Sequence, residues 1–107
     1  MPYTVIFSPE AEEQLVELYR YVAEAASPEA AAEFTDAIVT HCEELQDFPQ
    51  RGTMRNDIRP GLRITHYKKR TIIAFMALDD TVAVLGIYYG GQNYEEKLDD
   101  TTDGDVQ

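Results

Sequence analysis

Apolar residues in the first half of the chain recur every three or four positions, which is the spacing of an amphipathic helix. In the first such stretch, residues 9–26, the apolar positions are Ala11, Leu15, Leu18, Tyr19 and Val22. In the second, residues 28–47, they are Ala31, Phe34, Ile38, Cys42 and Leu45. Each stretch starts within the tetrapeptide SPEA, in which Ser suits the N-cap and Pro the first helical position. Because almost nothing separates the two helices, they are predicted to form an antiparallel hairpin.

Four other stretches are rich in β-branched and aromatic residues, and these predict strands. They are residues 3–7, 62–67, 71–78 and 81–89. The links at 68–70 and 79–80 are short enough to require antiparallel hairpins, and the nearly unbroken apolar run TIIAFMAL predicts a central strand. We therefore expect an α+β fold, with an N-terminal strand, an antiparallel helix hairpin on the sheet, and a three-stranded antiparallel meander.

The length of 107 residues predicts one domain, which we place at residues 1–95. Residues 48–61 contain Pro49, Gly52 and the pair Pro60-Gly61, so they are expected to form a connecting loop that ends in a type II turn. Residues 96–107 are acidic and contain few large apolar side chains, which predicts a mobile C-terminal tail.

The composition argues against a membrane protein and against a metal-binding protein. No apolar run approaches the roughly 18 residues that cross a bilayer, so we expect a cytoplasmic protein with no membrane partner. The single cysteine, Cys42, falls on the apolar stripe of the second helix and is predicted to be a core residue. Apart from Cys42, the chain has only His41 and His66 as nitrogen or sulfur ligands for a metal, so neither a metal site nor any other cofactor is expected.

Charge is divided into three blocks. Residues 1–50 carry 11 acids and one base, residues 51–76 seven bases and one acid, and residues 77–107 eight acids and one base, so the balances of −10, +6 and −7 sum to −11. The acidic surface repels phosphates, so direct nucleic-acid binding by the isolated chain is not expected. The basic block either neutralises acids of the same chain or binds carboxylates or phosphates of a partner.

Four motifs carry a resemblance to a known family. They are FSPEAEEQL after the first strand, FPQRG after the second helix, DIRPGLR before the second strand, and VAVLGIYYGGQNYE at the end of the meander. With the order of elements, residues 3–95 resemble the ParE branch of the RelE/ParE superfamily of toxins. The resemblance implies a plasmid-stabilising type II toxin that inhibits DNA gyrase and forms a hetero-oligomer with a cognate ParD-like antitoxin. The RelE branch instead implies ribosome-dependent cleavage of messenger RNA.

The chemistry of the last strand separates these two alternatives. RNA cleavage without a metal needs groups that transfer protons and cations that stabilise the transition state. Arg63 and Tyr94 are the candidate catalytic residues of such an RNase, but residues 88–94 contain neither His nor Arg. His41 and His66 are interpreted as packed or hydrogen-bonded residues. We therefore favour a non-enzymatic toxin without catalytic residues, and keep the RNase and a degenerate, non-toxic antitoxin-binding member as alternatives.

Two surfaces are expected from the family resemblance. The antitoxin is expected to lie in a groove between the helix hairpin and the sheet, against Leu15, Leu18, Tyr19 and Val22, with Arg59 and Arg63 at the rim. The gyrase-binding residues are expected to be Arg51, Arg55, Lys68, Lys69 and Arg70. Because a strand of roughly 17 Å separates its two ends, the basic block is predicted to form two patches.

Overall fold

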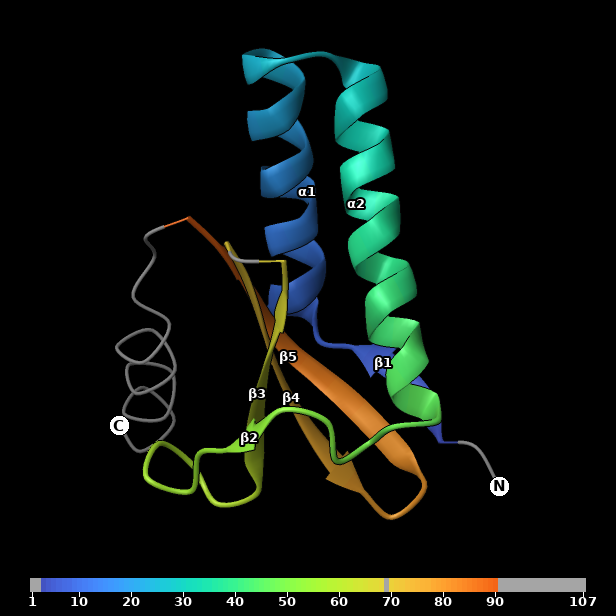
Figure 1. Ribbon diagram of the computed structural model, residues 1–107, viewed down its shortest axis with the longest axis vertical. Coiled ribbons are helices and arrows are strands. Elements are labelled where there is room, and N and C mark those ends of the chain that lie inside the picture. The colour runs from blue at the N-terminus through green and yellow to red at the C-terminus, as the bar shows by residue number, and fades with distance from the viewer. Residues whose placement is uncertain (1–2, 69, 91–107) are drawn as a thin grey trace.

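Two antiparallel helices lie against one face of a five-stranded sheet in the computed structural model, which describes residues 3–68 and 70–90 (Figure 1). The helices are α1 (Pro9–Ala25) and α2 (Pro28–Glu43). The strands, in their order across the sheet, are β1 (Thr4–Phe7), β5 (Thr81–Tyr89), β4 (Thr71–Leu78), β3 (Leu62–Tyr67) and β2 (Thr53–Met54). β1 is parallel to β5, and the other neighbours are antiparallel. The predicted α+β fold is confirmed.

Both helix starts have the predicted caps. The Ser8 hydroxyl oxygen accepts a hydrogen bond from the Ala11 N–H at 3.1 Å, and the Ser27 oxygen accepts one from the Ala30 N–H at 3.0 Å. Each cap is worth roughly 1 kcal/mol. The hairpin that follows is long: in Figure 1 the ends of the two helices near their connection project beyond the sheet.

The second helix ends earlier than the sequence pattern indicates. α2 stops at Glu43, and a 3₁₀ turn, η1 (Glu44–Gln46), replaces the last part of the helix predicted for residues 28–47. This tighter turn places Leu45 in the core with no exposed surface. It also leaves the Gln46 carbonyl free to accept the Tyr3 N–H at 2.9 Å, just before β1.

The main core lies between the helices and the sheet. Its buried residues are Ala11, Leu18, Ile38, Cys42, Leu45, Ile73, Phe75, Val82, Val84 and Ile87. A second cluster, on another part of the sheet, contains Leu62, Ile64, Ala74 and Tyr88, with Ile58 from the preceding loop packed against it. β4 contributes to both clusters, which confirms that its apolar run belongs to a central strand.

β2 was not predicted, because residues 48–61 were expected to be only a loop. The strand has two residues, both exposed, and so leaves no apolar alternation in the sequence. Its position depends on Gly52, which has φ +82° and lies so close to the Ile64 carbonyl that any Cβ would collide with it. The expected turn at Pro60-Gly61 is present: Gly61 has φ +84°, and the Leu62 N–H donates to the Arg59 carbonyl at 3.0 Å.

A bulge changes the alternation of β5. Ala74 of β4 is opposite Gly86 and Phe75 is opposite Val84, so Leu85 has no partner in this register. The extra residue allows Val84 and Ile87, three positions apart, both to pack in the main core.

Neither helix of the described residues has both the length and the apolar character needed to span a bilayer.

Candidate partner-binding site

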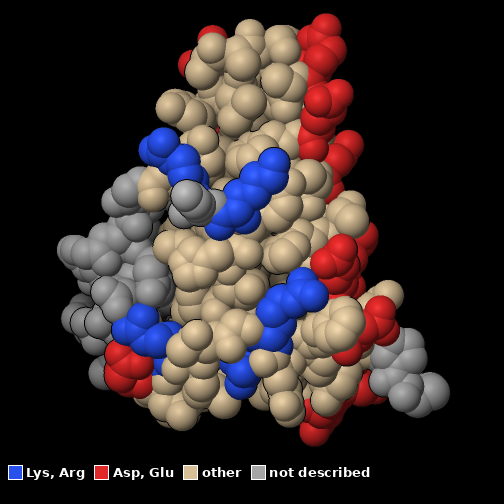
Figure 2. Space-filling model, in the orientation of Figure 1, with Lys and Arg blue, Asp and Glu red and all other residues tan. Residues whose placement is uncertain are grey.

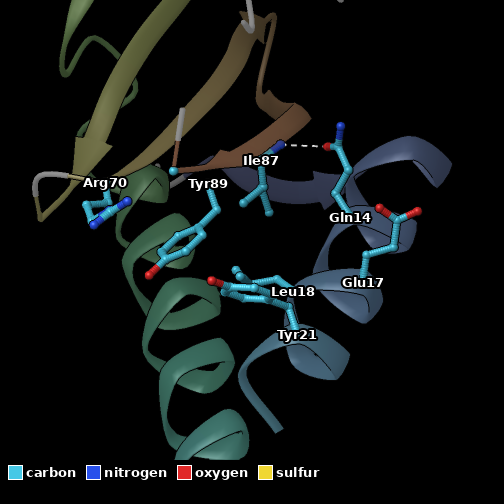
Figure 3. A pocket seen from close by; sticks show the side chains of 8 residues that line it. Gln14, Glu17, Leu18, Tyr21, Arg70, Ile87 and Tyr89 are labelled. Carbon is cyan, nitrogen blue, oxygen red and sulfur yellow. Dashed lines mark hydrogen bonds between the residues drawn. The ribbon is translucent and has the colours of Figure 1, made fainter. Parts of the chain in front are cut away.

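A cleft of about 420 Å³ lies between α1 and the end of β5 (Figure 3). Its lining residues are Gln14, Glu17, Leu18, Tyr21, Arg70, Ile87, Tyr89 and Gly90. It lies between the helix hairpin and the sheet, where the antitoxin groove was predicted from the sequence. Of the residues predicted to line the antitoxin groove, the cleft contains Leu18, and it adds Arg70, which was predicted to bind gyrase.

The cleft exists because β1 is shorter than β5. β1 ends at Phe7, and Ser8 makes the last contacts with β5: its N–H donates to the Val84 carbonyl at 2.9 Å and its hydroxyl to the Leu85 carbonyl at 3.1 Å. Beyond this point, α1 lies beside β5 in place of a strand. The Ile87 N–H donates to the side-chain oxygen of Gln14 at 2.7 Å, so a helix side chain replaces the missing strand partner.

Aromatic rings form one side of the cleft. The rings of Tyr21 and Tyr89 have centroids 6.0 Å apart and are tilted by 52°, and Phe34 meets Tyr89 edge to face at 5.6 Å. The guanidinium carbon of Arg70 lies 5.8 Å from the centre of the Tyr89 ring. This is within the range of a cation–π contact, which orients the arginine at the rim.

The charges of the lining are separated. In Figure 3, Arg70 and Glu17 lie at opposite ends of the cleft, with Leu18 and Ile87 between them. With apolar side chains between two opposite charges, this arrangement suits the binding of a peptide segment. It can hold an apolar side chain of a peptide with a carboxylate near Arg70 and a cation near Glu17.

Gln14 also takes part in a polar cluster around Tyr88 that sequence reasoning missed. Burial raises the pKa of the Tyr88 phenol, a hydrogen bond with Gln14 acts in the opposite direction, and Glu10 and Arg59 exert smaller, opposing electrostatic effects. Arg59, predicted to be at the rim of an antitoxin groove, is thus near this phenol. The sequence feature that could have revealed this cluster is the position of Gln14. It lies three residues after Ala11 and four before Leu18, so a polar side chain occupies the apolar stripe of the first helix.

Arg63, predicted at the antitoxin rim and as a candidate RNase residue, binds the chain's own loop. Its Nε donates to the Arg51 carbonyl at 3.1 Å, and its Nη2 donates to the carbonyls of Gln50 at 2.5 Å and Gly52 at 3.4 Å. These contacts hold the segment that leads into β2. The guanidinium therefore has a structural role whether or not it also contacts a partner.

Two further arginines of the basic block are paired with acids. Arg51 lies 3.3 Å from Glu44 and places its guanidinium carbon 5.0 Å from the Phe48 ring centre. Arg55 forms a two-pronged pair with Asp57 at 2.9 and 2.8 Å, and this hydrogen bonding holds the pKa of the Asp57 carboxyl below its usual value. Both side chains thus neutralise nearby acids, which was one of the two expected roles of the block.

The basic side chains are divided along β3. Figure 2 shows them in separate groups on one face, with uncharged surface between the groups and acidic side chains along the side of the molecule. Arg51, Arg55 and Arg59 precede β3, whereas Lys68 and Arg70 follow it. Lys69 and Tyr94 lie outside the described residues, as does the predicted tail, 96–107.

Comparison with known proteins identifies the family. Residues 5–94 match the family model described as the ParE toxin of the type II toxin–antitoxin system parDE. The chain belongs to the ParE toxin family. It is therefore a ParE/RelE-type toxin of a type II toxin–antitoxin system. No curated protein sequence matches the chain.

Solved structures share the fold of this ParE family member. A chain of the chromosomal ParDE toxin–antitoxin system from P. aeruginosa superposes with a TM-score of 0.71 at 21% identity, covering 82% of this chain and 96% of the other. A chain of the RelBE2 toxin–antitoxin complex from Mycobacterium tuberculosis gives a TM-score of 0.58 at 22% identity, covering 83% and 99%. At these identities the likeness concerns the fold.

The four apolar residues predicted to bind the antitoxin lie in different environments of the ParE-type fold. Leu18 is buried at the cleft, Val22 packs against the main core, and Leu15 and Tyr19 line a different hollow, between the two helices. The four positions therefore do not form one groove.

The other titratable candidates of the ParE family member are His41, His66 and Cys42. His41 packs against the Tyr67 ring at 5.3 Å and has Nδ1 3.8 Å from Glu44, while His66 is exposed on β3. Cys42 is fully buried, and this burial raises the pKa of its thiol to about 12, as expected for a core residue. Among the described residues, no group of three or more His, Cys, Asp or Glu side chains could hold a metal ion.

Proposed function

We propose that this ParE family member inhibits DNA gyrase and is neutralised by a cognate ParD-like antitoxin. The match of residues 5–94 to the ParE toxin family carries the proposal. The fold shared with a chain of a ParDE system supports the same assignment. No catalytic step is required, because a toxin of this kind acts by binding its target.

The antitoxin site in this proposal is the cleft between α1 and β5. An apolar anchor of the antitoxin packs on Leu18 and Ile87 and between the tyrosine rings, and an antitoxin carboxylate binds Arg70 at the rim. A guanidinium that already lies over Tyr89 needs little further ordering to bind a carboxylate. Leu15 and Tyr19, which lie outside this cleft, are not part of the proposed contact.

The gyrase-binding surface is proposed to include Lys68 and Arg70. Within the part of the chain that the structure describes, neither side chain forms an ion pair, and each lies over a tyrosine ring, Tyr67 or Tyr89. The cations of Arg51 and Arg55 are partly neutralised by Glu44 and Asp57. Of the predicted target-binding residues that are described, Lys68 and Arg70 therefore have the charge most available to a partner.

The alternative of a ribosome-dependent RNase gains no specific support. Its candidate Arg63 donates to three carbonyls of the chain's own loop. A guanidinium used in this way would have to break those bonds before it could stabilise a phosphate transition state.

A supercoiling assay tests the proposal. The purified chain is expected to reduce the rate at which gyrase supercoils relaxed plasmid, and expression of the chain alone is expected to stop bacterial growth. Co-expression of the protein encoded beside its gene should restore growth and form a complex that survives size-exclusion chromatography. Arg70→Glu should weaken both the inhibition of gyrase and the complex with the antitoxin. Arg20→Glu, an exposed change on α1, serves as the charge control.

The outcomes separate the alternatives. Growth arrest with fully active gyrase would contradict the proposed target, and cuts in translated messages would then favour the RNase. Normal growth despite ample folded protein, together with a stable complex, would favour the non-toxic antitoxin-binding member.

A further inference from the structure

Two cations lie at one corner of the sheet, in the link between β3 and β4. Tyr67 pairs with Thr71 across this link, and Thr71 pairs in turn with Tyr89 at the end of β5. Lys68 and Arg70 are both exposed there, and within the described residues neither side chain forms an ion pair. Lys68 and Arg70 together form what we call the cationic corner.

The described part of the chain ends at the same corner. Gly90 directly follows β5, and its N–H donates to the Arg70 carbonyl at 2.9 Å. A Cβ at position 90 would lie 4.0 Å from Nη2 of Arg70. Figure 3 shows the Arg70 side chain beside Tyr89, the last residue of β5. The residues that follow Gly90 are therefore joined to the fold next to this guanidinium.

The sequence that follows has the opposite charge. The acidic tail, residues 96–107, contains five acids, at positions 96, 99, 100, 103 and 105, and one base, Lys97. Residues 91–95 join it to Gly90, and a spacer of this length spans about 17 Å when extended. The acids are thus tethered within reach of the cationic corner. A short tether gives them an effective concentration on the order of millimolar there.

We propose that the acidic tail binds the cationic corner of its own chain and covers it. Tail carboxylates pair with the Lys68 ammonium and with the planar guanidinium of Arg70. Arg70 is also the proposed contact of gyrase and of an antitoxin carboxylate, so either partner binds it only by displacing the tail. The inference goes beyond the proposed function, because the contact belongs to the isolated chain and holds whatever the toxin's target is.

The other arginines around β3 are less open to tail carboxylates. Arg51 and Arg55 already pair with Glu44 and Asp57. Arg63 donates to carbonyls of its own loop. A tail carboxylate would have to replace these contacts, whereas at the cationic corner it competes with no ion pair of the described residues.

The helix hairpin repels the tail. α1 and α2 carry nine acids, and their only Lys or Arg is Arg20. This arginine lines a hollow together with Glu12, Glu13 and Glu17, so acids surround it. The tail of a second copy is also disfavoured, because two chains with a net charge of −11 each repel one another. The tether lets the chain's own tail bind without that cost.

A fluorescent hexaglutamate peptide tests whether the cationic corner is covered. Its affinity is measured by anisotropy at about 20 mM NaCl, where screening is weak. The parent chain is compared with a full-length four-Asn variant, which combines Asp99→Asn, Asp100→Asn, Asp103→Asn and Asp105→Asn. A tail that occupies the corner about four-fifths of the time lowers the apparent affinity about fivefold, so the four-Asn variant should bind the peptide about fivefold more tightly.

Two further variants separate the tail from the net charge. A four-Gln variant removes the same four charges from exposed positions on the helices, and it should bind the peptide no more than about twofold more tightly than the parent. Its substitutions are Glu12→Gln, Glu24→Gln, Glu33→Gln and Glu43→Gln. Lys68→Gln combined with Arg70→Gln removes the cationic corner. In that background the four Asn substitutions should raise the affinity no more than the four Gln substitutions do.

Amide chemical shifts give a second measurement in the full chain. The signals of Lys68, Arg70 and Thr71 should differ between the parent and the four-Asn variant. Raising NaCl to about 0.5 M should move the parent's signals toward those of the variant, because salt screens the attraction. Dilution from about 0.5 mM to about 0.05 mM protein should leave them in place, because the contact is intramolecular. Neither measurement uses gyrase or an antitoxin, so this proposal can fail without the proposed function failing.

Each contrary result overturns the proposal. Equal peptide affinity of the parent and the four-Asn variant would show that the corner is not covered. Equal gains in the four-Asn and four-Gln variants would show that net charge alone acts. A gain specific to the four-Asn variant that persists without Lys68 and Arg70 would place the tail on other cations. Chemical shifts that change on dilution would show that the tail of a second copy binds the corner.

Discussion

The side-chain oxygen of Gln14 accepts a hydrogen bond of 2.7 Å from the backbone N–H of Ile87, across 73 positions of sequence. The contact joins α1 to the part of β5 that extends beyond β1. It satisfies a strand N–H that has no neighbouring strand to bind, and it defines one end of the cleft. Loss of an acceptor at such a position costs more than loss of an exposed hydrogen bond.

Gln14→Met is therefore expected to destabilise the protein. Methionine keeps the length and apolar contacts of the side chain but removes the acceptor, so the free energy of unfolding should fall by about 1–2 kcal/mol. Urea unfolding measures the loss, and hydrogen exchange should show faster exchange of the Ile87 amide. Gln46→Met, at an exposed position in η1, is the matched control. An unchanged exchange rate at Ile87 would contradict the role given to Gln14.

Arg63 is expected to matter for stability before it matters for binding. Arg63→Met removes the hydrogen bonds to the carbonyls of residues 50–52 and should lower the free energy of unfolding by about 1–3 kcal/mol. Arg70→Met removes an exposed guanidinium and should change it by no more than about 0.5 kcal/mol. Urea unfolding of both variants checks this difference, and equal stabilities would show that the loop does not depend on Arg63.

Because Cys42 is buried, we expect the protein to lose stability at alkaline pH. Burial raises the pKa of its thiol from 9.0 to about 12 in the folded chain, with a smaller contribution from Glu43. Between these values the unfolded thiol loses its proton while the folded thiol keeps it, so rising pH favours the unfolded state. The stability is intact below pH 9 and should fall by about 1.4 kcal/mol per pH unit above it, up to about pH 12.

The matched variant for this effect is Cys42→Ala. It should be less stable than the parent at neutral pH because it leaves a cavity, yet its stability should decline less steeply above pH 9. Some decline remains, since burial also raises the pKa of Tyr88. Denaturant unfolding at several alkaline pH values provides the slopes, and identical slopes in both proteins would rule out the thiol as the cause.

The acidic hairpin predicts a stability that increases with salt. Like charges lie one helical turn apart at Glu13 and Glu17 and at Glu29 and Glu33, and such pairs repel each other. Raising NaCl from about 0.02 M to about 0.3 M shortens the screening length and should raise the unfolding midpoint by a few degrees. Calorimetry measures the shift.

Two substitutions at one position test the origin of that shift. Glu13→Gln removes one repulsive partner, and Glu13→Lys replaces repulsion with attraction to Glu17. The midpoint at low salt should rise in the order Glu, Gln, Lys, and the dependence on salt should weaken in the same order. A salt effect of equal size in all three would assign it to another part of the protein.

Local sequence determined the elements and the family of this protein. Ser8 and Ser27 supply caps, the apolar stripes define both helices, and the strands from Leu62 to Tyr89 have the predicted bounds. These features depend on neighbours a few residues apart, which a sequence pattern records directly. The motifs that carry the ParE resemblance belong to the same level, and the family match over residues 5–94 confirms it.

Only the tertiary structure decided how the site is built. β2 forms because Gly52 can approach the Ile64 carbonyl, and α2 tightens at Glu44 because the turn places Leu45 in the core. Arg63 binds carbonyls twelve or so positions away, and Gln14 completes the edge of a strand 73 positions away. Such contacts arise from packing between distant segments, so residue type alone revealed that these side chains are polar or charged, and the fold selected their partners.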